Sequence, residues 1–138
     1  MPNIRKTEET MEYYFAKTTD LGFDEAIDRV TDVLKEEGFG ILTEIDVQAT
    51  FKKKLDVDVP PYRILGACNP HFAYQALQAE NLIGTMLPCN VIVRDAGAGQ
   101  VQIAAVDPIA SMQAVENEDL AGIAQEVRSR LQRVVEQV

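Results

Sequence analysis

The sequence predicts an α+β fold, a two-layer sandwich in which helices pack on one face of a sheet. Apolar residues recur at three- and four-residue steps in two long segments, as in amphipathic helices, and short β-rich runs lie between the helical segments. Two further β-rich runs flank a glycine-containing turn, which is typical of an antiparallel hairpin. The expected order is β-α-β-α-β-α-β-β-α. A chain of 138 residues fits one domain, expected at residues 12–138 after a flexible, polar lead-in at residues 1–11.

The first strand and helix have clear local signals. Residues 13–16 form a short aromatic run that favours a strand. Gly22 is placed to cap the following helix, and Gly38 is placed to end it in a left-handed conformation. The apolar stripe of this helix consists of Phe23, Ala26, Ile27, Val30, Val33 and Leu34.

The middle of the chain alternates strands with shorter helices. Residues 39–47 predict a second strand, and Asp46 is placed to cap a short helix at residues 47–55. Two prolines stop that helix before a third strand at residues 62–68. Asn69 and Pro70 then combine a capping side chain with a proline in the first helical turn, so they predict the start of a third helix.

A hairpin and a long helix complete the predicted fold. Residues 87–94 and 100–107 are the hairpin strands, and residues 81–86 before them are expected to form a loop. The last helix begins at Asn117, and its apolar stripe consists of Leu120, Ile123, Val127, Leu131, Val134 and Val138. Both faces of the hairpin are apolar over part of their length. Because helices cover one face of the sheet, the other face favours association into a homodimer.

The charge excludes several classes of partner. The formal net charge is −9, and an acidic surface repels phosphate backbones and anionic lipid headgroups. We therefore expect neither a nucleic-acid partner nor a membrane partner. No run of about 18 apolar residues occurs, the first residues do not resemble a secretory signal, and two cysteines do not make a disulfide framework. These observations favour a cytoplasmic protein.

The densest cluster of chemically interesting residues lies at the start of the third helix. Cys68, Asn69 and His71 lie where a strand leads into a helix N-terminus, a position that favours anions and would favour a thiolate at Cys68. Cys89 lies at the start of a hairpin strand, and two thiols with the His71 imidazole would suit zinc or copper if they converge. Buried cysteines are more often small core residues, so a structural role is the main alternative.

Two carboxylates form a second candidate group. Glu44 and Asp46 are two residues apart on a predicted strand and so share one face. They suit a cation or acid–base chemistry, although a helix cap and a surface ion pair explain them equally well.

Several blocks of sequence, in the right order, resemble domain-of-unknown-function family 302. They are residues 40–47 (GILTEIDV), 65–70 (LGACNP), 76–80 (ALQAE), 83–84 (IG), 87–91 (LPCNV) and 107–108 (DP). The resemblance implies a compact α+β domain of bacteria and archaea, typically homodimeric, with no established activity and no known cofactor.

The resemblance also bears on the candidate residues. One branch of the family has glycine in place of Cys68 and lacks the cysteine at position 89, whereas Asn69, Pro70, Glu44 and Asp46 carry over. This implies a structural role for Asn69 and Pro70. Our hypothesis is a non-catalytic homodimer that binds a small molecule or a protein partner in a pocket near Glu44, Asp46, Cys68, Asn69 and Cys89. The alternative is a metal-binding or thiol-redox protein that uses Cys68 and Cys89, with His71 as a further metal ligand.

Overall fold

The computed structural model describes residues 12–138, so the expected lead-in at residues 1–11 lies outside the described part of the chain. In this described part, five strands form one sheet in the order β1-β5-β4-β3-β2, and every neighbouring pair is antiparallel. The strands are β1 (Tyr14–Thr19), β2 (Gly40–Asp46), β3 (Tyr62–Cys68), β4 (Cys89–Gly97) and β5 (Gln100–Val106). The predicted α+β class is confirmed, and β4 and β5 form the predicted hairpin.

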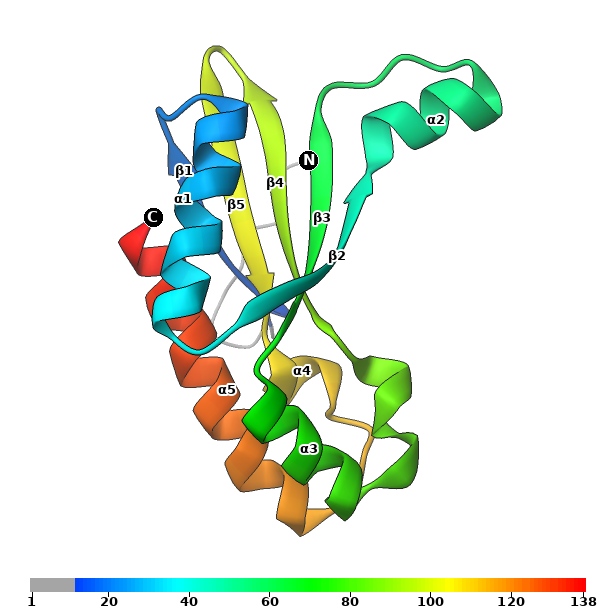
Figure 1. The fold of residues 1–138 in the computed structure, drawn as a ribbon, viewed down its shortest axis with the longest axis vertical. Coiled ribbons are helices and arrows are strands. Elements are labelled where there is room, and N and C mark those ends of the chain that lie inside the picture. Colours follow the sequence, from blue (N-terminus) through cyan, green and yellow to red (C-terminus); the bar gives the residue numbers. More distant parts are fainter. Residues whose placement is uncertain (1–11) are drawn as a thin grey trace.

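Two long helices cover one face of this sheet. They are α1 (Phe23–Glu36) and α5 (Glu118–Gln137), which run along the same side of the strands (Figure 1). The ends of α1 are those predicted, since Gly22 is its N-cap and Gly38 adopts a left-handed φ of +90° just after it. The main core lies between these helices and the sheet. Its fully buried side chains include Val30, Leu34, Leu65, Ile103 and Leu131.

The segment between β2 and β3 departs from the two layers. It contains α2 (Val47–Leu55), which projects away from the body of the molecule (Figure 1). Asp46 caps this helix as predicted, because its Oδ1 accepts a hydrogen bond of 2.9 Å from the Ala49 N–H. No residue of α2 is buried, and the side chain of Leu55 is 65% exposed. We call residues 47–61 the α2 arm.

Three shorter helices lie beyond one end of the sheet, beside the first half of α5 (Figure 1). They are α3 (Pro70–Ala79), the 3₁₀ helix η1 (Asn81–Met86) and α4 (Pro108–Ser111). Ala76, Ile83 and Leu120 form a second buried cluster among them. Neither η1 nor α4 was predicted, because such short helices contain too few residues to show a helical repeat. The predicted packing of helices on one face of the sheet therefore holds for α1 and α5. The three shorter helices lie past the end of the sheet instead.

The second face of the sheet is partly apolar, as the strand alternation predicts. Ile92 and Ala104 are half-buried there, and with Tyr14 and Tyr62 they border a hollow of about 380 Å³. Within residues 12–138, none of the helices has the length and apolar character needed to span a membrane.

Candidate functional site

An apolar pocket lies where the ends of β3 and β4 meet the short helices and α5. Its volume is about 300 Å³, near the lower end of the roughly 300–1,000 Å³ typical of small-ligand sites. Within residues 12–138, residues from seven elements or their ends border it, among them Cys68, Ala73, Gly84, Cys89, Met112 and Ile123. Leu42 and Leu77 also border the pocket and are 66% and 40% exposed, so its edge is apolar as well.

Three of the five predicted site residues border this pocket. They are Cys68, Asn69 and Cys89. The β3–β4 register explains why the two cysteines are near each other: Cys89 lies opposite Ala67, the residue that precedes Cys68. The sequence could not establish this proximity, because it depends on which strands pair and in what register.

The two thiols are in an environment that disfavours charge. Burial raises the pKa of the Cys68 thiol, and burial together with the neighbouring Cys68 raises the pKa of Cys89 to about 11. The sequence suggested that the helix N-terminus favours a thiolate at Cys68, whereas burial in the folded chain raises the pKa of this thiol and so acts in the opposite direction. Both cysteines are free and protonated at neutral pH.

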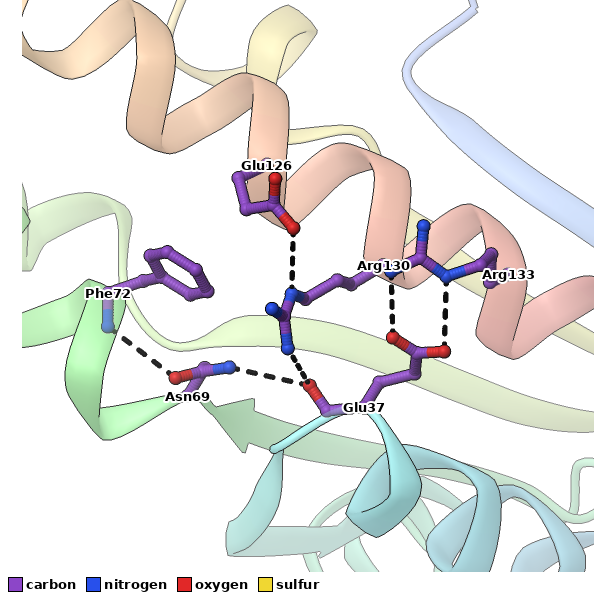
Figure 2. Close-up of polar contacts among 6 residues, drawn as sticks. All are labelled: Glu37, Asn69, Phe72, Glu126, Arg130 and Arg133. Carbon is purple, nitrogen blue, oxygen red and sulfur yellow. Dashed lines mark hydrogen bonds and ion pairs between the residues drawn. The ribbon is translucent and has the colours of Figure 1, made fainter.

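Asn69 has a structural role at the edge of the pocket. Its Oδ1 accepts a hydrogen bond of 3.5 Å from the Phe72 N–H and so caps α3, as predicted. Its Nδ2 donates to the Glu37 carbonyl at 3.4 Å, which ties the start of α3 to the end of α1 (Figure 2). A Cβ at Gly38 would lie 2.8 Å from the Asn69 Nδ2, so glycine there also permits this close approach.

Two arginines of α5 complete the junction shown in Figure 2. Arg130 donates from Nη1 to the Glu37 carbonyl at 3.0 Å and from Nε to Glu126 at 2.9 Å, and its guanidinium lies over the Phe72 ring. Arg133 holds the Glu37 carboxylate with two hydrogen bonds, of 2.9 and 3.1 Å. These bonds lower the pKa of Glu37. The junction fixes three helices around one wall of the pocket.

Glu44 and Asp46 do not border the pocket. Both lie near Arg63 of β3, which forms an ion pair with Glu44 and lies 3.7 Å from the Asp46 carboxylate. The Arg63 guanidinium also lies over the Phe23 ring, and its buried Nε has no hydrogen-bond partner among residues 12–138. The structure therefore separates the predicted carboxylates from Cys68 and Asn69, and it gives Asp46 the alternative role of a helix cap.

His71 points to the exposed surface of α3. Its Nε2 lies 3.3 Å from Gln75 Nε2, and it is not among the residues that border the pocket. Within residues 12–138, no group of three or more histidine, cysteine, aspartate or glutamate side chains is placed to hold a metal ion.

Much of the pocket wall was not predicted as part of a site. Met112, Leu120, Ile123 and Val127 come from the end of α4 and from α5. In the sequence, the residues of α5 form an ordinary core stripe, and nothing marks which part of the stripe faces a cavity instead of the sheet. The available signal is the length of this helix: its 20 residues span about 30 Å, whereas the 7 residues of β3 span about 23 Å.

Comparisons with known proteins identify the family of this chain. The family model "Domain of unknown function DUF302" matches residues 15–138. The chain belongs to this family. It is similar to a crystal structure of an uncharacterized conserved DUF302 protein from Bacillus stearothermophilus, with 28% sequence identity and a TM-score of 0.85, over 92% of this chain and 98% of the other. No curated protein matches the chain. The predicted family and fold are therefore confirmed, and the DUF302 family has no described function.

Proposed function

We propose that this DUF302 protein binds a small, neutral, apolar molecule in the pocket bordered by Cys68 and Cys89. The observation that carries the proposal is the pocket itself: about 300 Å³ of space bordered almost entirely by apolar side chains. Well-packed cores contain few voids larger than a water molecule, so a space of this size is more typical of a binding site than of packing.

The lack of charged side chains among the described residues at the pocket indicates the class of ligand. No aspartate, glutamate, lysine, arginine or histidine is among the described residues that border it. Among the described residues, Asn69 is the one bordering side chain with an amide, and its oxygen and nitrogen are already paired with backbone groups. A charged ligand would lose its hydration without gaining a partner, so the pocket favours neutral molecules.

A neutral dye whose fluorescence depends on polarity, such as Nile red, tests this proposal. We expect saturable fluorescence enhancement with the wild-type protein. Ala73→Phe places a ring in the pocket and is expected to abolish saturable binding. Gln78→Phe is the matched control, because Gln78 is exposed on the same helix and does not border the pocket.

The outcomes of this experiment are distinct. Binding that is lost in Ala73→Phe and kept in Gln78→Phe supports the pocket as the site. Equal binding by both variants would place the dye elsewhere and reject the proposal, and so would a wild-type protein without saturable binding. Cooperative unfolding of each variant verifies that the substitution has not disrupted the fold.

We also propose that the second face of the sheet pairs with a second copy of the chain. The support is the partly apolar hollow around Ile92 and Ala104, on a face that α1 and α5 leave open. Ala104→Glu is expected to convert a dimer into a monomer in light scattering coupled to gel filtration. Ala96→Glu, in the exposed hairpin end, is expected to leave the mass unchanged. A monomeric wild-type protein would refute this proposal.

A further inference from the structure

The two cysteines are the reactive groups that the pocket leaves unused. Among the described residues that border it, the side chains that can form strong bonds to a ligand are Asn69, Cys68 and Cys89, and Asn69 is already engaged at both ends. No hydrogen bond is found for either thiol among the described residues. A ligand in the pocket would therefore meet two protonated sulfur atoms and otherwise apolar walls.

The two cysteines lie close together on neighbouring strands. Cys89 opposes Ala67 and Cys68 is the next residue, so antiparallel ladder geometry places the two Cα atoms roughly 6 Å apart. That separation lies in the range in which two cysteine side chains can reach one another. Regular strand alternation alone would direct the two side chains to opposite faces. However, Cys68 is the last residue of β3, both residues border the same pocket, and Cys68 is close enough to Cys89 to raise the pKa of its thiol.

The apolar surroundings restrict what the thiols can bind. A complex that leaves a net charge on the sulfur atoms would be costly in this pocket, as the raised pKa values of both thiols indicate. A ligand that replaces both thiol protons and leaves a neutral product avoids that cost. Sulfur is a soft ligand and prefers soft elements, and Met112 adds a thioether to the same pocket.

We propose that Cys68 and Cys89 form a dithiol site for a soft, thiol-binding element that carries a small apolar group, with trivalent organic arsenic as the representative chemistry. This inference rests on the proposed function, because the apolar group would occupy the same pocket. In the reaction with an aryl arsenic(III) oxide, both S–H bonds and the As=O bond break, and two As–S bonds form. One water molecule leaves with the oxygen and both protons, arsenic stays trivalent, and the product is neutral.

Phenylarsine oxide provides the test, with intact-mass measurement as the readout. We expect the reduced wild-type protein to bind one equivalent, to keep it in excess β-mercaptoethanol and to release it to a competing dithiol. Cys68→Ala and Cys89→Ala are each expected to lose the adduct in β-mercaptoethanol, because a single thiol cannot chelate arsenic. Met112→Leu is the control for a bordering sulfur and is expected to keep the adduct.

The outcomes separate this inference from the proposed function. An adduct retained by the wild type and lost in Cys68→Ala supports the dithiol site. Because Cys68 is half-buried, that variant is expected to fold even if Cys89→Ala does not. If the wild type binds Nile red but does not retain the arsenical, the dithiol site is rejected and the apolar pocket stands. Equal retention by Cys68→Ala and the wild type also rejects the dithiol site.

Discussion

Gly66 lies beside the pocket in a position where even one methyl group has no space. It is in the middle of β3, opposite Thr43 of β2 and Asn90 of β4. A Cβ added at Gly66 would overlap the Thr43 Oγ1 and lie 2.8 Å from the Pro88 Cγ. Pro88 borders the pocket, so Gly66→Ala must displace part of the pocket wall as well as a neighbouring side chain.

The expected cost can be compared with a matched substitution. Inserting a methyl group into a packed site typically costs about 1–3 kcal/mol, which corresponds to a melting temperature lower by roughly 3–12 °C for a chain of this length. Gly40→Ala is the control, because Gly40 lies on the adjacent strand β2 and a Cβ there would meet nothing within 4 Å. That variant is expected to change stability by less than about 1 kcal/mol, in either direction.

Urea denaturation followed by circular dichroism measures both variants. We expect Gly66→Ala to unfold at a lower urea concentration than Gly40→Ala, with the same slope. Thr43→Ala in the Gly66→Ala background is expected to restore part of the loss, since it removes one of the two overlapping groups and leaves the Pro88 contact. The reasoning would be refuted if Gly66→Ala were as stable as Gly40→Ala.

Three further predictions concern the junction and the thiols. Asn69→Ala is expected to lower the free energy of unfolding by about 1 kcal/mol through loss of a helix cap and to keep Nile red binding, and loss of binding in a folded variant would contradict a structural role. Glu37→Gln is expected to be less stable than the wild type at pH 7. The pKa of Glu37 is lowered in the folded state by its hydrogen bonds to Arg133, so the stabilisation is present above the unfolded pKa of about 4.3 and is lost as the pH falls through the lower folded value. Urea titrations at pH 7 and pH 3 should therefore show a difference between the two proteins that shrinks in acid, and a constant difference would argue against the ion pair. Iodoacetamide is expected to label both cysteines slowly at pH 7, Cys68 before Cys89, with the rate at Cys89 still rising between pH 9 and pH 11. Mass mapping of quenched samples measures this, and rapid labelling of Cys89 at pH 7 would contradict its burial.

The features that the sequence predicted well depend on neighbouring residues. Gly22, Gly38, Asp46 and Asn69 each end or begin a helix through their own backbone or a side chain that reaches two or three residues, so a short window contains the whole signal. The hairpin is similarly local. Such elements were predicted with the correct type and nearly the correct bounds.

The candidate site depends on contacts between distant segments, and its prediction was only partly right. Glu44 and Asp46 form ion-pair contacts with Arg63 because β2 pairs with β3 in one particular register, which no local pattern specifies. Cys68 and Cys89 meet at the pocket for the same kind of reason. The pocket also exists because α5 extends beyond the sheet. That arrangement depends on how all the elements pack, so no single segment of sequence predicts it.

The α2 arm is expected to unfold locally before the rest of the molecule. Because no residue of α2 is buried, unfolding this helix exposes little apolar surface and should need far less energy than unfolding the sheet. Its amide hydrogens are expected to exchange with solvent quickly, while those of β3 remain protected. Residues 56–61 are therefore a suitable place to insert an affinity tag or a short peptide while leaving the pocket and the core intact.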